Sequence, residues 1–271
     1  MSYTVSEANL QPLSVNDLQA MKLRGEKIAC LTAYDAGFST LLDHAGIDVL
    51  LVGDSLGMVV QGHGTTLPVS MNDMIYHTAC VSRVRRRAFV IADLPFMSYV
   101  TPVAAAENAA LLIQQGGAQM VKLEGARLEC VRFLADQGVS VCGHLGLLPQ
   151  SINYLGGYKV QGKDPKEAGK IVQDAENLEQ AGAQLLVLEC VPAGLAEQIT
   201  ARLSIPVIGI GAGVNCDGQV LVLYDMLAIS AGKRPRFSKN FMQGEKSIEA
   251  AVSAYQQAVK QGRFPSPEHC F

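Results

Sequence analysis

Short apolar runs recur along this chain at near-regular spacing and alternate with longer stretches of mixed polarity. The runs are rich in Val, Ile and Leu and do not alternate with polar residues, which is typical of strands buried on both faces of a parallel sheet. The pattern predicts eight strands: Ile28–Ala33, Asp48–Asp54, Phe89–Asp93, Met120–Glu124, Ser140–Gly143, Leu185–Glu189, Pro206–Ile210 and Val220–Leu223.

The stretches between these strands carry helix signals. Helices are predicted over Phe38–Ala45, Met71–Val84, Ala104–Gln115, Leu128–Gln137, Pro165–Gln180 and Leu195–Arg202, with a further amphipathic helix within Gly244–Gly262. One more helix is expected before the first strand, capped by Ser14 and with Leu18 and Met21 as apolar positions. Because it precedes the first strand, it could plug the closed end of a barrel. Residues 149–164 are predicted to form a long polar loop.

Eight strand–loop–helix units in 271 residues predict a (β/α)8 TIM barrel, a fold of about 250 residues. Residues 1–271 are expected to form this single domain, with 1–26 as an N-terminal arm and capping helix and 244–271 as a C-terminal helix and tail. An open doubly wound sheet is the alternative. The number of strands and the acids at their ends favour the closed barrel.

Four of the predicted strands finish on a carboxylate: Asp54, Asp93, Glu124 and Glu189. In a barrel all strand ends meet on one face, so these acids share a pocket with His144, which follows the fifth strand. Unpaired carboxylates gathered there would repel each other and resist ionisation, and a bound cation removes that cost. A single acid at a strand end is more often a cap for a loop amide, but several aligned acids favour a metal site.

The residue types at these strand ends fit the enolisation of an α-keto acid. Asp54 and Asp93 are short carboxylates suited to Mg²⁺, which prefers one or two such ligands together with water and substrate oxygens. Glu189 lies among apolar residues, which should raise its pKa towards that of a general base; otherwise it is a partner of Lys122 or of the metal. Such a base would remove a proton beside a keto group whose developing charge the ion stabilises.

Lys122 and His144 each allow more than one interpretation. Lys122 lies two residues before Glu124 and points to the same side of its strand. It is either a structural ion pair, a cation for a substrate carboxylate, or an amine for a Schiff base. His144 is either a substrate hydrogen-bond partner or a satisfied core histidine.

Composition and charge exclude several other classes of protein. The net charge is −3, and the one basic run, around Arg85–Arg87, is short, so no nucleic-acid partner is expected. The chain shows no apolar span of membrane length and no leader pattern, so no membrane association is expected. Seven dispersed cysteines without a C-x-x-C pair indicate reduced thiols and a cytoplasmic protein.

Several motifs carry a resemblance that covers nearly the whole chain. They are Leu31–Asp35, Leu51–Met58, Thr66–Val69, Ala92–Phe96, Gly143–Gly146, Gly156–Lys159, Leu188–Pro192, Ile208–Gly213 and Asp217–Gln219. With these motifs the chain closely resembles the ketopantoate hydroxymethyltransferase family. The resemblance implies a barrel of the phosphoenolpyruvate/pyruvate superfamily that transfers a one-carbon unit from 5,10-methylenetetrahydrofolate to 3-methyl-2-oxobutanoate. The product would be 2-dehydropantoate, for pantothenate and coenzyme A synthesis.

The resemblance also implies roles for single residues. Asp54, Asp93 and Glu124 match the Mg²⁺ site of the family, and Glu189 matches its proton acceptor. The candidate substrate contacts are Asp54, Ser55, Asp93, Lys122 and His144. A homo-oligomer, typically a decamer, is expected. Two alternatives remain: another C–C bond enzyme on the same barrel (a lyase of the phosphoenolpyruvate mutase/isocitrate lyase kind or a Schiff-base aldolase), and a non-catalytic barrel that binds a ligand.

Overall fold

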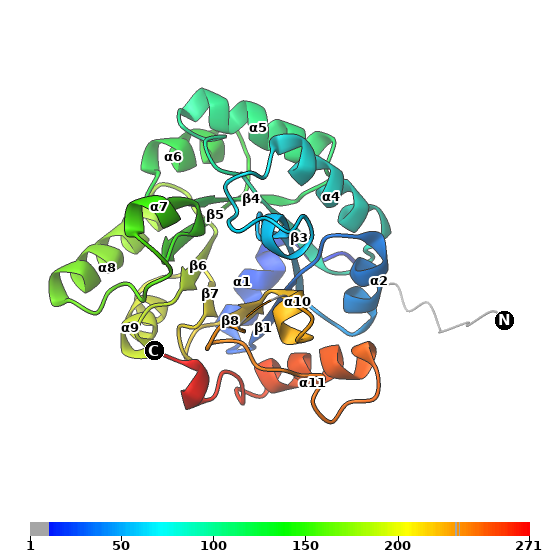
Figure 1. Cartoon of the computed structure of the whole chain (residues 1–271). Helices are drawn as coiled ribbons and strands as arrows, with labels where there is room; N and C mark the ends of the chain where they lie inside the picture. The colour runs from blue at the N-terminus through cyan, green and yellow to red at the C-terminus, as the bar shows by residue number, and fades with distance from the viewer. Residues whose placement is uncertain (1–10, 231, 233) are drawn as a thin grey trace.

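Eight parallel strands follow one another around a closed barrel, and the first strand pairs with the last. They are β1 (Ile28–Thr32), β2 (Val49–Val52), β3 (Phe89–Asp93), β4 (Met120–Glu124), β5 (Val141–Gly146), β6 (Leu185–Glu189), β7 (Val207–Ile210) and β8 (Gly218–Leu221). Figure 1 shows the ring of strands with helices around its outside. The predicted (β/α)8 barrel is therefore confirmed, and the open sheet is excluded.

The structure is a computed structural model that describes residues 11–230, 232 and 234–271, so the first ten residues of the predicted arm lie outside the described residues. Its α-helices are α1 (Val15–Leu23), α2 (Ala36–His44), α3 (Leu56–Val59), α4 (Met71–Val84), α5 (Pro102–Gln114), α6 (Leu128–Asp136), α7 (Ile152–Leu155), α8 (Pro165–Gln180), α9 (Ala193–Arg202), α10 (Leu223–Met226) and α11 (Ile248–Lys260). Two 3₁₀ turns are η1 (Pro149–Ser151) and η2 (Pro267–His269). Within these ranges no helix combines the length and apolarity needed to cross a bilayer.

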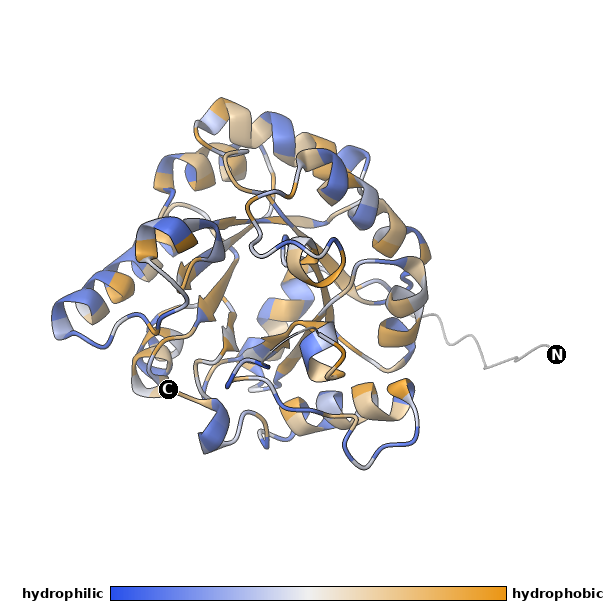
Figure 2. Cartoon of the chain, in the orientation of Figure 1, coloured by the Kyte–Doolittle hydropathy of each residue, from blue (hydrophilic) through white to orange (hydrophobic). Residues whose placement is uncertain are grey.

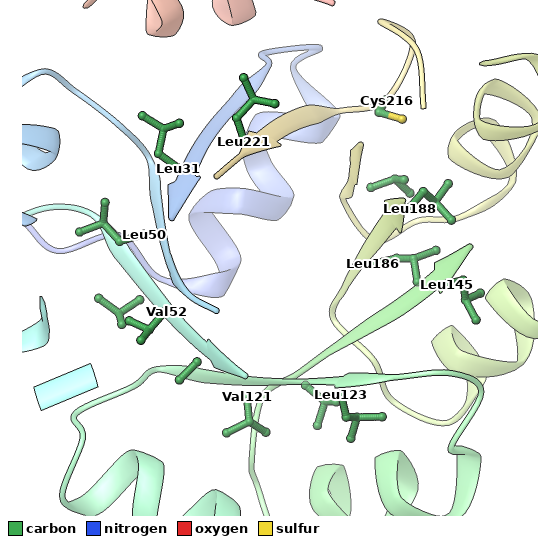
Figure 3. Close-up of a cluster of buried hydrophobic side chains, with 14 of the residues drawn as sticks. Leu31, Leu50, Val52, Val121, Leu123, Leu145, Leu186, Leu188, Cys216 and Leu221 are labelled. Carbon is green, nitrogen blue, oxygen red and sulfur yellow. The ribbon is translucent and has the colours of Figure 1, made fainter. Parts of the chain in front are cut away.

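The strands separate two layers of buried side chains. Side chains on the outer face of the barrel, such as Leu123 and Leu188, point away from its axis and pack under the surrounding helices (Figure 3). Figure 2 shows hydrophobic residues concentrated in the strands, while the helices carry hydrophilic residues as well. The strand side chains that point inward form a second buried cluster inside the barrel.

The interior of the barrel is closed at one end by α1. Ser14 caps this helix with its hydroxyl and forms a capping box with Asp17, as the sequence suggests. Leu18 and Met21 are buried against the inward side chains at the beginnings of the strands, Phe89 among them. The predicted plug is confirmed, and chemistry at the opposite end of the barrel is shielded from this side.

Several predicted boundaries were wrong. The last strand begins at Gly218, where a Cβ atom would lie 2.5 Å from the Ile28 oxygen, so only glycine allows this close pairing with β1. Residues 223–226 instead form α10, which places Tyr224 and Asp225 in a helix. The fifth strand extends to Gly146, so His144 lies within it. The polar loop predicted over 149–164 contains η1 and α7.

Candidate active site

The predicted acids converge at the mouth of the barrel, at the ends of β2, β3, β4 and β6. Strand register sets neighbours directly opposite each other: Asp93 pairs with Lys122, Glu124 with His144, and Gly146 with Glu189. Asp54 follows β2, and its backbone N–H donates to Asp93 Oδ2 at 3.2 Å. The sequence-predicted residues therefore share one site.

Asp93 and Lys122 form a buried ion pair, with Nζ 2.9 Å from Oδ1. Burial alone lowers the pKa of Lys122, but the neighbouring carboxylates, above all Asp93, outweigh it and raise that pKa above its ordinary value. Lys122 is therefore a fixed positive charge within the site. A charged ammonium suits a substrate carboxylate and is a poor nucleophile for a Schiff base.

Ser55 lies beside this pair, at the start of α3. Its hydroxyl is 2.9 Å from the hydroxyl of buried Tyr34. Gly53, two residues earlier, brings the chain close to the acids: a Cβ atom there would lie 2.9 Å from Ser55 Oγ and 3.4 Å from Asp93 Oδ2. The short turn thus places a hydroxyl and a carboxylate from one loop next to Asp93.

His144 lies between Lys122 and Glu189. Its Nδ1 is 3.4 Å from Lys122 Nζ and 3.8 Å from Glu124 Oε1, while its Nε2 is 3.2 Å from Glu189 Oε2. Burial and the Lys122 charge hold the pKa of His144 well below its ordinary value, so the imidazole is neutral. Within the described residues Nε2 is buried without an aligned hydrogen-bond partner, which leaves it available to a substrate oxygen.

Glu189 is the most accessible of these groups. Its side chain is 14% exposed, against 3–5% for Asp93, Lys122, Glu124 and His144. Burial raises the pKa of Glu189 to about 7. The carbonyl of Glu189 accepts a hydrogen bond from Leu147 at 2.8 Å. A Cβ atom on Gly146, whose φ is 93°, would lie 2.1 Å from that oxygen, so glycine is required there.

The remaining acids repel each other in a buried setting. Burial and the Asp93 charge raise the pKa of Asp54 to about 7, and burial and the Asp54 charge raise the pKa of Glu124 well above its usual range. A cation between these oxygens would relieve the repulsion.

The donor set fits Mg²⁺ better than a metal that needs a complete protein cage. Among the described residues, no group of three or more His, Cys, Asp or Glu side chains is arranged to hold a metal ion. Mg²⁺ needs only one or two carboxylates, because it keeps water and takes oxygens from its substrate. Asp54 and Asp93 supply such a pair.

Sequence reasoning missed three side chains at this site. Gln150 on η1 donates its amide to Asp54 Oδ2 at 2.8 Å, and Tyr99 donates its hydroxyl to the Gln150 side chain. The hydroxyl of Tyr158 lies 3.6 Å from Met58 Sδ on α3, and burial and then the charge of Glu189 raise its pKa. Tyr99 could have been suspected as an aromatic residue shortly after a strand-end acid, and Tyr158 lies within the Gly156–Lys159 motif of the family resemblance. No sequence signal separates Gln150 from other loop residues.

A cavity of about 630 Å³ adjoins the site. Its wall includes Glu124 and Gln150 on the side of the acids, and Phe96, Met97 and Val100 from the segment after β3. These three apolar side chains are 44–62% exposed. The cavity therefore borders the site at Glu124 and extends from there towards Lys170 and Asp174 of α8.

A family model and a named relative both relate this chain to the same enzyme family. Residues 12–267 match the family model described as ketopantoate hydroxymethyltransferase. The protein from Burkholderia multivorans named 3-methyl-2-oxobutanoate hydroxymethyltransferase is 59% identical, with 100% of each chain covered.

Solved structures show the same fold at low identity. The phosphoenolpyruvate phosphomutase from Streptomyces platensis has a TM-score of 0.59 and 12% identity, covering 92% of this chain and 88% of that one. A 2,3-dimethylmalate lyase of the PEP mutase/isocitrate lyase superfamily has a TM-score of 0.52 and 16% identity, covering 72% and 70%. These likenesses show the same barrel fold.

Proposed function

Because this chain belongs to the ketopantoate hydroxymethyltransferase family and transfers a hydroxymethyl group to 3-methyl-2-oxobutanoate, we propose that the barrel mouth is where it does so. The observation that carries the proposal is the convergence of Asp54, Asp93 and Lys122 with Glu189 on one side of the barrel. This arrangement offers a cation site, a positive charge and a base within reach of one small molecule. The reaction belongs to pantothenate biosynthesis.

The proposed cofactor is Mg²⁺, held by Asp54 and Asp93 with Glu124 as the third carboxylate of the site. The mutual repulsion of these buried acids supports it. When bound, the ion would draw negative charge onto the keto oxygen of the substrate and so acidify the neighbouring C–H bond.

Protein side chains hold the keto acid for deprotonation. We assign its carboxylate to Lys122 and Ser55, and a further hydrogen bond to His144 Nε2, which has no aligned partner among the described residues. Glu189 takes the proton from C3, because it is the most accessible acid and its pKa of about 7 lets it exchange protons near neutrality.

The carbon that loses its proton then attacks a one-carbon donor. We propose 5,10-methylenetetrahydrofolate as this donor and 2-dehydropantoate as the product. One C–C bond forms to the methylene carbon of the donor, and the two C–N bonds that held this carbon break. Water supplies the hydroxyl group, the proton from Glu189 and one from water go to the two folate nitrogens, and tetrahydrofolate leaves. The space beside Glu124 supports a second, larger substrate near the site.

Exchange of the C3 hydrogen of 3-methyl-2-oxobutanoate in deuterated water tests the proposal. We expect exchange that requires Mg²⁺ but proceeds without the folate, because deprotonation precedes the attack. Hydroxymethyl transfer should need both. Exchange or transfer that survives exhaustive chelation, and does not respond when Mg²⁺ is restored, would rule out the metal-assisted reaction.

A Schiff-base aldolase on the same barrel is disfavoured by electrostatics. The carboxylates around Lys122 keep its amine protonated, and a protonated amine cannot attack a carbonyl. Borohydride should therefore trap no substrate on Lys122.

The assembly and the compartment are also proposals. The family resemblance supports a homo-oligomer, and we propose a decamer, which light scattering coupled to gel filtration would identify by its mass. All seven cysteines are free thiols, five of them buried, which supports a reducing cytoplasm.

A further inference from the structure

Gln150 contacts two of the acids: its side chain donates to Asp54, which follows β2, and its backbone N–H donates to Glu124 at the end of β4. It lies on η1, directly after β5, and is 5% exposed. We propose that Gln150 is a positioning residue: it fixes the carboxylate of Asp54 relative to that of Glu124, so that the two meet a bound cation and keto acid in one geometry. This inference rests on the proposed function of the mouth.

The side-chain amide of Gln150 uses all of its hydrogen-bonding groups. Its Nε2 donates to Asp54 Oδ2 at 2.8 Å and to the Leu94 carbonyl at 3.0 Å, while its Oε1 accepts from the Tyr99 hydroxyl. The acceptor and donor sides of the amide are thus distinguished by their partners. Because each group is committed, the amide cannot turn over, and one oxygen of Asp54 is held in a fixed direction.

The backbone of Gln150 secures the other carboxylate. Its N–H donates to Glu124 Oε2 at 3.0 Å, and the Tyr99 hydroxyl accepts from the Glu124 N–H at 3.4 Å. These bonds form a closed ring through Gln150, Tyr99 and Glu124, and Asp54 is joined to the ring through the Gln150 amide. Three segments of the barrel rim, those at the ends of β2, β3 and β4, are therefore held by one uncharged residue.

Two buried carboxylates that repel each other need such a holder. Without the amide, Asp54 loses its only side-chain partner among the described hydrogen bonds and can turn away from Glu124. Mutation of a group that orients a metal ligand typically lowers metal affinity or activity by about 10- to 100-fold. A role that merely fastens η1 to the barrel would lower stability and leave the affinity of the folded protein unchanged.

The test compares Mg²⁺ binding by titration calorimetry, without substrate, in the wild-type chain and in Gln150→Met. Methionine keeps the length and the backbone N–H but removes the amide. We expect Mg²⁺ binding to weaken by about 10- to 100-fold. Gln161→Met is the matched control, because its amide donates only to the Lys159 carbonyl, at 3.0 Å. It should bind Mg²⁺ as the wild type does.

Further measurements separate the outcomes. In the C3 exchange assay, Gln150→Met should have a lower kcat and should need a higher Mg²⁺ concentration than the wild type. If Gln150 had a purely structural role, the substitution would reduce only the fraction of folded protein. If Gln150→Met does not fold, Tyr99→Phe replaces it, since this change frees the Gln150 oxygen and should weaken Mg²⁺ binding by a smaller factor. Unchanged affinity in a folded variant overturns the inference alone. A wild-type chain that binds no Mg²⁺ overturns the proposed metal site together with it.

Discussion

Exposure divides the charged side chains at the mouth into two roles. Asp93, Lys122 and Glu124 are almost completely covered, whereas Glu189 is partly open to solvent. A group that gives and takes protons needs such access, and groups that hold an ion or a substrate carboxylate do not. The division of labour between base and binding groups is therefore visible in burial.

Replacing Glu189 with Gln tests the assignment of the base. The amide keeps the shape of the side chain but cannot accept the C3 proton, so exchange should fall by about 10²- to 10⁴-fold while Mg²⁺ and keto-acid binding persist. Deuterium incorporation followed by NMR measures the loss. Glu197→Gln, an exposed position on α9, serves as the control. Undiminished exchange in Glu189→Gln would reassign the base.

The pH dependence of the same exchange follows from the Glu189 pKa of about 7. Only the ionised carboxylate takes a proton, so the rate should level off above about pH 8 and fall about tenfold for each unit below 7. Initial rates of deuterium incorporation at saturating Mg²⁺ between pH 5 and 9 give this profile. A profile flat through pH 7 would contradict the assignment.

At the level of elements, α1 shows how a local signal became a tertiary contact. The capping serine and the spacing of Leu18 and Met21 are legible in the sequence, and the structure places both side chains inside the barrel. The helix closes the end of the barrel away from the acids. Its contribution should therefore be to stability and not to catalysis.

Replacing Leu18 with Ala tests this separation. Leu18 is fully buried, so the variant should lose about 2–5 kcal/mol of unfolding free energy through the cavity that it leaves. Urea unfolding followed by circular dichroism measures the loss. Leu23→Ala on the same helix is the control: this side chain is 86% exposed, and its loss should cost less than about 0.5 kcal/mol. Exchange activity per folded Leu18→Ala molecule should be unchanged.

The sequence was most informative where a pattern is local. Buried strands ending in acids predicted the barrel and brought Asp54, Asp93 and Glu124 together, because all strand ends of a barrel meet on one face. The sequence did not predict that the last strand begins at Gly218, where β1 approaches closely. It also did not predict the role of Gln150, which arises only when the segment after β5 folds over the rim of the barrel. Contacts between distant segments leave no periodic trace along the chain.

For the whole molecule, the buried acids couple stability to pH and to the metal. The pKa of Asp54 is raised to about 7, so its contribution to folding is fully present near pH 4 and is lost as the pH rises through 7. Mg²⁺ needs the ionised carboxylate and must displace a proton below that pH. Mg²⁺ should therefore stabilise the fold most above pH 7, where ionised Asp54 destabilises the metal-free protein.

Thermal unfolding with and without Mg²⁺ checks this coupling. The rise in unfolding temperature caused by Mg²⁺ should be larger at pH 8 than at pH 6. Below pH 7, the proton on Asp54 weakens Mg²⁺ binding by about tenfold, or about 1.4 kcal/mol, for each pH unit. Ca²⁺ at the same ionic strength controls for general salt effects. An equal rise at both pH values would mean that Asp54 is not a ligand.

The pairing of β1 with β8 has a consequence for how the protein is made. During synthesis, the free edge of β1 cannot be paired until residues 218–221 have been made. Until then the sheet is open and has two unpaired edges. All residues from 28 to 221 must be synthesised before β1 and β8 can pair. A nascent chain stalled short of that point would expose backbone that invites aggregation, and it is there that a chaperone has most to protect.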